Sequence, residues 1–393
     1  MGVNNLLFSR RGGGELRNLV ALVLSLVLAL ALCWTAGGLA LADPLDPKLV
    51  EPFIAQMVDR HGFSRAGLET LFGQVERSER VLAAISKPAE AKPWHSYRRI
   101  FVTPERIRLG VDFWKRHGDI LERVAAHYGV APEVLVAIVG VETYYGANTG
   151  DYRVVDALSS LAFYFPSRAP FFTSELEAFL LMTRDQKLDP LTLRGSYAGA
   201  MGIPQFIPTS YRRYAVDFDA DGRPDIWRSV PDVLASVANY FKEHGWEAGQ
   251  PVAVPARVTG DAYQPLLYAG KAPEIGLDAF SKAGVVPETP VAGQPKAMLV
   301  ALDAEGGKEF WVGLMNFYVI TRYSHSASYA MAVFQLAQAI RDQALGDQAA
   351  AVPTIDQIVI DQIGVSHVAS RPKEPGVGNN NSNEWAIDGG ARH

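Results

Sequence analysis

The spacing of apolar and polar residues predicts a mainly helical chain with one β-rich segment. Residues 43–130 carry apolar side chains at helical spacing, as at Leu49, Phe53 and Met57. Between residues 249 and 312, prolines and glycines instead separate short apolar runs, which is typical of strands. Helical spacing returns at residues 326–344. We therefore expect an α+β fold that is mainly α and contains a small β-rich insertion.

One predicted helix carries a single acidic residue on an apolar face. It spans about residues 131–146, with a proline in its first turn and a glycine at its end. Leu135, Ile138 and Glu142 fall at positions i, i+3 and i+7 and share a face. A carboxyl group among apolar side chains has a raised pKa and can stay protonated near neutral pH. Glu142 is thus a candidate general acid, although a helix-end glutamate that reaches solvent or pairs with an arginine would give the same pattern.

The first 42 residues have the layout of a secretory signal peptide. Three arginines precede an apolar stretch at residues 19–33, and Ala40-Leu41-Ala42 suits cleavage before residue 43. The stretch is also long enough for a retained membrane anchor, and Cys33 invites a lipoprotein interpretation. Leu32 precedes this cysteine, where lipoprotein processing prefers a small residue. We therefore predict cleavage after Ala42, with a membrane anchor as the alternative.

Composition excludes several kinds of site from the mature chain. Cys33 is the only cysteine, so its removal leaves no disulfide, thiolate zinc site or cysteine nucleophile. The formal net charge is −5, and loss of the arginine-rich leader makes it more negative. Such a chain has no overall attraction to nucleic acid. The histidines show no zinc-binding spacing, and no GxSxG motif indicates a serine hydrolase.

Three motifs in a fixed order carry a family resemblance. They are the runs Glu142-Thr143-Tyr144-Tyr145-Gly146, GAMGIPQFIP at residues 199–208 and NFYVITRY at residues 316–323. Over roughly residues 45–345 the chain resembles the B-type lytic murein transglycosylases, the membrane-bound lytic transglycosylase B family. The resemblance implies a lysozyme-like helical core and a periplasmic location. It also implies cleavage of the β-1,4 bond between N-acetylmuramic acid and N-acetylglucosamine in peptidoglycan.

The resemblance also implies a domain order and a mechanism. Glu142 would protonate the departing oxygen and then take the proton of the muramyl O6 hydroxyl, which gives a 1,6-anhydro end. We expect a monomer that acts on glycan strands, and docking to other cell-wall enzymes stays open. The expected segments are a signal peptide (1–42), an N-terminal helical region (43–130), the catalytic core (131–248), the β-rich insertion (249–312), the rest of the core (313–345) and an extension (346–393) with a disordered tail.

Further site residues follow from the resemblance one at a time. Ser196 would hydrogen-bond the catalytic carboxyl, and Gln205 and Phe206 would contact the glycan, although a packed turn would also suit this segment. Two positions depart from the family pattern. Phe171 stands where the family can have a tyrosine, and Ser324 stands where it can have an asparagine. The missing asparagine amide puts a hydrogen bond to the substrate or to Glu142 in doubt. Other positions would face sugar or peptide stems, or else be ordinary core residues: Tyr97, Arg168, Tyr240, Tyr323 and Tyr329.

An acidic, EF-hand-like loop at residues 217–232 indicates a cation site. Asp217, Asp219 and Asp221 stand at positions 1, 3 and 5 of an EF-hand pattern, and a glycine stands at position 6. Position 7 would offer the backbone carbonyl of Arg223, while position 12 is an arginine instead of the usual glutamate. By the resemblance, Asp232 would supply the last carboxylate. We predict one structural Ca²⁺ site, and the cleavage reaction itself does not need this ion. The alternative is a solvated acidic turn that binds no ion.

A second catalytic carboxylate is not evident. Typical glycosidases need two carboxylates, but one suffices if the substrate supplies its own nucleophile. The nearest alternatives are Asp151, which we interpret as a loop residue, and Asp156, which we interpret as a helix N-cap. Two other functions stay open: a glycan-binding scaffold with weakened activity, and a muramidase that uses water instead of O6.

Overall fold

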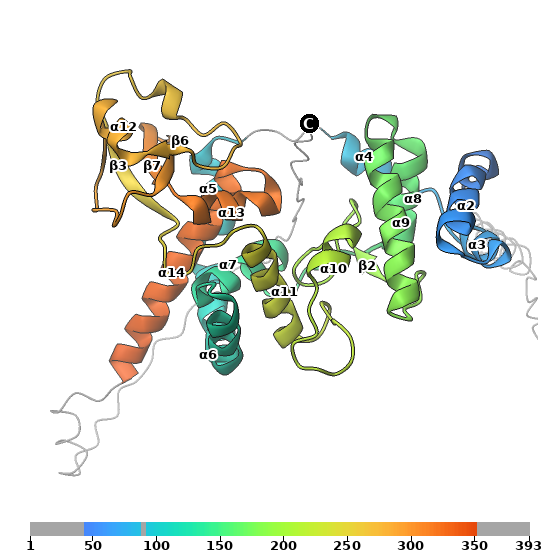
Figure 1. Ribbon diagram of the computed structural model, residues 1–393. Coiled ribbons are helices and arrows are strands. Elements are labelled where there is room, and N and C mark those ends of the chain that lie inside the picture. The colour runs from blue at the N-terminus through green and yellow to red at the C-terminus, as the bar shows by residue number, and fades with distance from the viewer. Residues whose placement is uncertain (1–42, 88–91, 352–393) are drawn as a thin grey trace, which may run out of the picture. The chain divides into compact units, whose positions relative to one another are not determined.

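The computed structural model describes residues 43–87 and 92–351, with side chains described up to residue 346. Contacts divide the chain into Met1–Pro44 and Leu45–His393. The predicted signal peptide and the predicted disordered tail from about residue 376 lie outside the described residues. Everything below concerns the second unit (Figure 1).

The N-terminal part of this unit is helical, as its sequence pattern predicts. Capping residues explain several of the helix starts: Ser64 accepts a hydrogen bond from Gly67, and Thr103 accepts one from Arg106. The helices here are α2 (Pro47–His61), α3 (Arg65–Phe72), α4 (Glu79–Ser86), α5 (Trp94–Phe101) and α6 (Pro104–Tyr128).

Helix α7 (Pro132–Thr143) runs through the main hydrophobic core. Pro132 occupies its first turn, and every residue from Val134 to Val141 is buried. A helix that is apolar on all sides must be covered on all sides, and α7 contacts α6, α11 (Val230–Glu243) and α14 (Ala327–Ala351). Figure 1 shows α6 and α14 beside it. The core therefore fixes the position of Glu142 at the end of this helix.

Each of the next three α-helices after α7 packs against the α-helix that follows it in the chain. Helix α8 contacts α9, and α9 contacts α10. A short antiparallel pair joins the start of α8 to the glycine-rich loop, because Tyr152 pairs with Gly195. The elements are β1 (Tyr152–Arg153), α8 (Val154–Tyr164), α9 (Ala169–Asp185), β2 (Arg194–Gly195) and α10 (Pro208–Tyr214).

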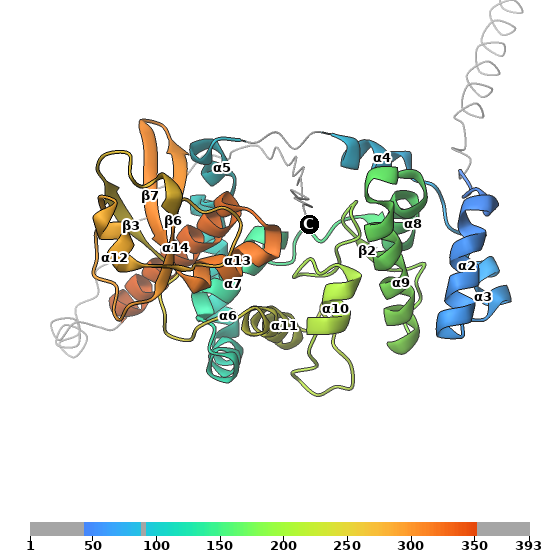
Figure 2. The same ribbon diagram turned by 45° about the horizontal axis from the view of Figure 1, so that its top comes forward.

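The β-rich segment is a sheet of five strands in the order β4-β6-β7-β3-β5, with antiparallel neighbours. It has a small core of its own, which includes Phe280, Leu299 and Val312. Helix α13 (Met315–Ser324) follows the sheet and packs on α14, as Figure 2 also shows. The elements are β3 (Ala253–Val258), β4 (Ile275–Gly276), α12 (Leu277–Lys282), β5 (Val285–Pro287), β6 (Lys296–Ala304) and β7 (Gly307–Gly313).

Two local predictions need correction. Helix α8 begins at Val154, so Asp156 lies in its first turn and is not the N-cap; its carboxylate binds the Arg153 guanidinium and the Glu76 backbone N–H. Helix α14 continues to Ala351, so the start of the expected extension at residues 346–393 is helical.

None of the helices in the described part of the chain is long and apolar enough to cross a membrane by itself. Helices α6 and α7 reach the necessary length and apolar character only as a pair, which is bent by 111°.

Candidate active site

Glu142 stands in the last turn of α7, at the boundary of the buried core. It is partly exposed, while its neighbours Val141 and Thr143 are buried. Burial of the carboxyl group raises its pKa from an ordinary value to about 7, and a hydrogen bond from Tyr329 opposes this rise. Burial dominates because a carboxylate loses more hydration here than one phenol restores. At neutral pH a large fraction of Glu142 is therefore protonated.

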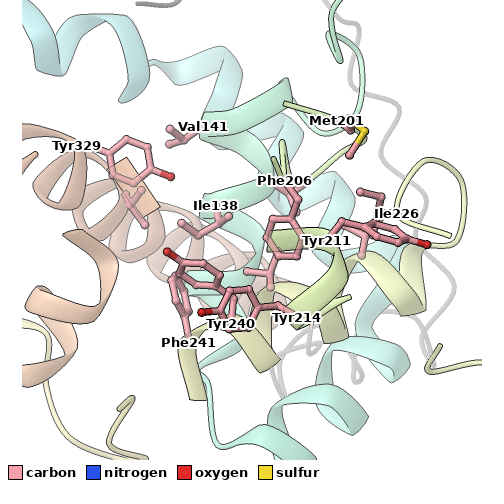
Figure 3. Packing of buried hydrophobic residues seen from close by; sticks show 14 of the residues in the cluster. Ile138, Val141, Met201, Phe206, Tyr211, Tyr214, Ile226, Tyr240, Phe241 and Tyr329 are labelled. Atoms are coloured by element: carbon pink, nitrogen blue, oxygen red, sulfur yellow. The ribbon is translucent and has the colours of Figure 1, made fainter. Parts of the chain in front are cut away.

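Two stacked tyrosines cover the carboxyl group. The Tyr329 hydroxyl donates a hydrogen bond to Glu142 Oε1. Tyr323 stacks on Tyr329 with ring centroids 6.4 Å apart and an interplanar angle of 10°, and its hydroxyl donates to the Pro204 carbonyl at 2.8 Å. Figure 3 shows the Tyr329 hydroxyl turned toward the helix that carries Ile138 and Val141. Residues from α7, α13 and α14 thus meet at one carboxyl group.

The turn after Glu142 holds two tyrosines in a left-handed backbone conformation. Tyr144 has φ 54° and Tyr145 has φ 61°, which is uncommon for residues other than glycine. Tyr145 folds back onto α7: a Cβ on Gly140 would lie 2.6 Å from its ring, and its hydroxyl donates to the Arg106 carbonyl at 2.6 Å. Such backbone strain persists where surrounding contacts hold it, often at functional sites. The turn therefore holds the end of α7 in one conformation.

The glycine-rich segment lies against this turn. Thr143 Oγ1 donates to the Ile203 carbonyl at 2.9 Å, and Gln205 Nε2 donates to the carbonyls of Thr149 and Gly202 at 3.1 and 2.9 Å. Gln205 also has a positive φ of 53°. Gln205 is thus brought to the α7 end by hydrogen bonds.

Ser196 and Phe206 differ in detail from the sequence expectation. Ser196 Oγ accepts hydrogen bonds from the Ala198 and Ala200 amides at 3.3 and 3.1 Å, whereas the hydrogen bond to Glu142 comes from Tyr329. Phe206 exposes only 2% of its surface, because it packs against Tyr240 and Tyr323. Its ring supports the site from inside, and little of it is left for a sugar to touch.

The other expected positions divide into buried and partly exposed groups. Tyr240 is buried and donates to the Arg322 carbonyl at 2.7 Å. Tyr97 is partly exposed and raises the pKa of Tyr329, which places Tyr97 near the hydrogen bond between Tyr329 and Glu142. The Arg168 guanidinium lies 4.4 Å from the centre of the exposed Phe171 ring. Ser324 is partly exposed at the end of α13.

Glu175 is a buried residue that the sequence interpretation missed. Its carboxylate accepts hydrogen bonds from the Thr209 N–H at 3.0 Å and the Thr209 hydroxyl at 2.7 Å. It therefore holds the first turn of α10, directly after Gln205 and Phe206. Its signal in the sequence is a lone glutamate on the apolar face of α9.

The acidic loop gathers three of the expected metal ligands. Carboxylate oxygens of Asp217, Asp219 and Asp221 lie within 4.8 Å of one another. Hard oxygen donors at this spacing fit a cation such as Ca²⁺. Asp232 is not in this group: its fully buried carboxylate accepts hydrogen bonds from the N–H groups of Phe218 at 2.7 Å and Asp225 at 2.8 Å. In this conformation Asp232 anchors the loop backbone and is not positioned as a ligand.

Comparison with known proteins decides the family. Residues 46–338 match the family described as Transglycosylase SLT domain. The chain belongs to this lytic transglycosylase family. The membrane-bound lytic murein transglycosylase B of Escherichia coli (strain K12) is 46% identical over 300 residues, which cover 74% of this chain and 82% of the relative. This transglycosylase is therefore an enzyme that cleaves peptidoglycan.

Solved structures of similar proteins share the fold. The lytic transglycosylase Slt35 of Escherichia coli in complex with calcium is 43% identical, with a TM-score of 0.71, and the match covers 77% of this chain and 97% of that one. SltB3 of Pseudomonas aeruginosa in complex with NAG-anhNAM-pentapeptide is 33% identical, with a TM-score of 0.66, and the match covers 73% of this chain and 77% of that one. The mainly helical, lysozyme-like fold class predicted from the sequence is confirmed.

Proposed function

We propose that this transglycosylase cleaves the β-1,4 bond between N-acetylmuramic acid and N-acetylglucosamine and leaves a 1,6-anhydro end, with Glu142 as its single acid and base. The observation that carries this proposal is the environment of Glu142, whose pKa is raised to about 7 by burial. An acid that also has to act as a base works best when its pKa lies near the operating pH.

In the first step, protonated Glu142 gives its proton to the departing glycosidic oxygen. The C1–O bond breaks, and positive charge develops at C1 and the ring oxygen of the muramyl residue. The carboxylate that remains accepts the hydrogen bond of Tyr329, which favours the charged form. Tyr329 therefore stabilises Glu142 in the state that the second step requires.

In the second step, Glu142 takes the proton of the C6 hydroxyl while O6 bonds to C1. This returns Glu142 to its protonated form. A carboxylate nucleophile would have to stand about 5–5.5 Å from the acid, where its charge would shift the pKa of the acid. Among the described residues, however, burial and Tyr329 account for the pKa shift of Glu142, and another carboxylate does not contribute.

Other aspartates near the motif are engaged elsewhere. Asp151 is exposed and pairs with Arg80 at 3.4 Å, and Asp156 pairs with Arg153 at 2.6 Å. These contacts favour an intramolecular nucleophile over a second protein carboxylate. The anhydro sugar named in the SltB3 complex supports the same chemistry for a relative.

Replacement of Glu142 by Gln tests the proposal. The amide keeps the shape of the side chain but cannot supply the proton, so release of soluble fragments from purified sacculi should fall by at least about a hundredfold. Binding to the same sacculi, measured by co-sedimentation, should stay near the wild-type level. Wild-type turnover in this variant would contradict a single-acid mechanism.

We also propose one structural Ca²⁺ ion in the acidic loop, held by Asp217, Asp219, Asp221 and the carbonyl of Arg223. The calcium complex of Slt35 and the three convergent carboxylates support this site. The ion would neutralise the clustered carboxylates and fix the loop. For location, we propose export to the periplasm with cleavage after Ala42, and retention by the leader as the alternative, which the name of the membrane-bound Escherichia coli relative favours.

A further inference from the structure

Four basic side chains gather where α10, α11 and α13 meet. Arg213 lies near the end of α10, His244 caps the end of α11, Arg322 lies in the last turn of α13, and His325 caps that helix. Arg213 and His325 are exposed, while His244 and Arg322 are partly exposed. We call these four residues the basic cluster.

Aromatic rings hold the basic cluster together. The Arg213 guanidinium lies 5.1 Å from the centre of the Tyr214 ring, which is 5.3 Å from the His244 ring. His244 stacks on Tyr240 at 4.1 Å, and its Nδ1 lies 2.7 Å from the Tyr240 carbonyl. The position of the His244 ring is therefore fixed by packing, and the Arg213 guanidinium lies beside the same group of rings.

The Arg322 guanidinium is surrounded by neutral groups. It lies 4.2 Å from the centre of the Tyr318 ring and donates to Thr321 Oγ1 at 3.1 Å and to the Tyr268 hydroxyl at 3.4 Å. Its Nε is buried without a hydrogen-bond partner. A charged group that is partly buried among neutral partners gains from the arrival of an anion.

The basic cluster has little negative charge around it. Within the described ranges none of its four members forms an ion pair, whereas many other arginines do, among them Arg65, Arg108 and Arg341. Burial lowers the pKa of His244, and the charges of Arg213 and Arg322 lower it further, while the hydrogen bond with the Tyr240 carbonyl and the exposed Glu243 oppose this shift. Burial, Arg322 and His244 lower the pKa of His325. Near neutral pH the positive charge of the basic cluster therefore comes from Arg213 and Arg322, while the two histidines offer ring N–H donors, in a chain whose net charge is −5.

One layer of tyrosines connects the basic cluster with the active site. Tyr240 donates to the Arg322 carbonyl, and its ring lies 4.9 Å from the Tyr323 ring, which stacks on Tyr329 beside Glu142. Members of the basic cluster do not contribute to the pKa shift of Glu142. Both Arg322 and Glu142 act on the pKa of Tyr240, so Arg322 and the catalytic carboxyl lie near the same ring, although the basic cluster does not tune the acid.

We propose that the basic cluster binds a carboxylate of the peptide stem that branches from the glycan strand. This inference rests on the proposed function, since it assigns a second contact for the same substrate. A peptide carboxylate has the charge that the cluster lacks, and guanidinium groups bind carboxylates through paired hydrogen bonds. The contact adds affinity for strands that carry stems and leaves the chemical step unchanged.

The test uses the full mature chain and a double variant at the two exposed members, Arg213→Gln with His325→Gln. Arg212→Gln is the matched control, because Arg212 is exposed on the same helix but faces Asp185 at 4.0 Å. Binding is measured by calorimetry in the Glu142→Gln background, so it does not depend on cleavage. The probes are a disaccharide pentapeptide of peptidoglycan, the same compound with its peptide carboxylates amidated, and the bare disaccharide.

We expect the double variant to bind the disaccharide pentapeptide roughly fivefold more weakly, as the loss of one exposed charge pair and one imidazole hydrogen bond would give. Binding of the amidated and bare probes should not change, and Arg212→Gln should match the Glu142→Gln background throughout. Equal binding of the pentapeptide probe by the double variant and the background would overturn the inference, as would an equal loss with all three probes.

Cleavage assays separate this inference from the proposed function. With active Glu142, the double variant should show a raised KM on strands with stems and an unchanged kcat. If wild-type protein releases no anhydro ends while the binding differences persist, the proposed function fails and the carboxylate site stands. If anhydro ends form while the double variant has the wild-type KM on strands with stems, the carboxylate site fails and the proposed function stands.

Discussion

At the scale of single residues, one carboxyl group is balanced between two opposing effects. Burial favours the neutral form of Glu142, and the Tyr329 hydroxyl favours the charged form. Burial is the larger effect and brings the pKa to about 7. The same group can therefore lose a proton in one step and regain it in the next.

The balance predicts an alkaline limb in the pH dependence of activity. The reaction starts from protonated Glu142, so kcat/KM should fall about tenfold per pH unit above pH 7. Tyr329→Phe removes a hydrogen bond that favours the carboxylate, so the pKa of Glu142 rises and the limb moves up by about one pH unit. A pH profile of kcat/KM on soluble glycan strands measures this shift.

Tyr323→Phe is the control for that shift. It removes a hydroxyl that binds the Pro204 carbonyl and does not bind Glu142, so the alkaline limb should stay in place. A limb that stays in place in Tyr329→Phe, or that moves equally in both variants, would mean that Tyr329 does not set the pKa of Glu142.

Glu142 could be predicted from the sequence because its signal is local. Its place on an apolar helix face follows from positions within one helix. Its hydrogen-bond partner lies 187 residues further along the chain, so local spacing contains no information about that contact. The family resemblance placed Tyr329 beside the substrate, but only the packing of α7 against α14 brings its hydroxyl to Glu142.

At the scale of elements, the helix ends position the active site. Helix α7 ends in the left-handed turn at Tyr144, and α10 begins directly after the segment that carries Gln205. The buried carboxylate of Glu175 on α9 holds the first turn of α10 through Thr209. Glu175 is therefore a positioning residue for the segment beside Glu142.

Two substitutions at Glu175 separate its hydrogen bonds from its charge. Glu175→Ala removes the partner of the Thr209 N–H and hydroxyl, but Thr209 is exposed, so water replaces part of this loss and we expect the free energy of unfolding to fall by about 1–2 kcal/mol. Glu175→Gln can accept from the N–H and donate to the hydroxyl, so the loss should be below about 1 kcal/mol. Urea unfolding followed by circular dichroism measures both, and equal losses would show that the charge matters more than the hydrogen bonds.

The sequence predicts elements better than their ends. The helical and β-rich segments follow the apolar spacing, since that spacing reflects which faces are buried. Asp156 lies two residues after the first residue of α8, and its carboxylate pairs with the Arg153 guanidinium instead of capping the helix. The two-residue pair β1 and β2 depends on contacts between residues about 40 apart, so short-range patterns do not reveal it.

At the scale of the whole molecule, the acidic loop joins α10 to α11 and bears on global stability. The sequence predicted Asp232 as a metal ligand, but in the structure its carboxylate accepts hydrogen bonds from three backbone N–H groups of the loop. These hydrogen bonds satisfy the carboxylate without a metal. The three outer carboxylates of Asp217, Asp219 and Asp221 are the ones that stand close together.

Calcium should therefore stabilise the fold through the outer carboxylates. We expect the Tm to rise when calcium replaces a chelator, because a ligand that binds only the folded state stabilises it. Asp221→Asn should reduce this rise, while Asp232→Ala should lower the Tm with or without calcium. Differential scanning fluorimetry checks all three proteins, and the same Tm for the wild type in calcium and in chelator would rule out the site.

The most direct test of the central claim is the mass of the muropeptides that the mature protein, residues 43–393, releases from purified sacculi. If Glu142 acts alone and O6 is the nucleophile, the products are lighter than hydrolysed muropeptides by one water and disappear in Glu142→Gln. Products with reducing ends, at the mass of the hydrolysed species, would contradict it and require a water nucleophile with a second base.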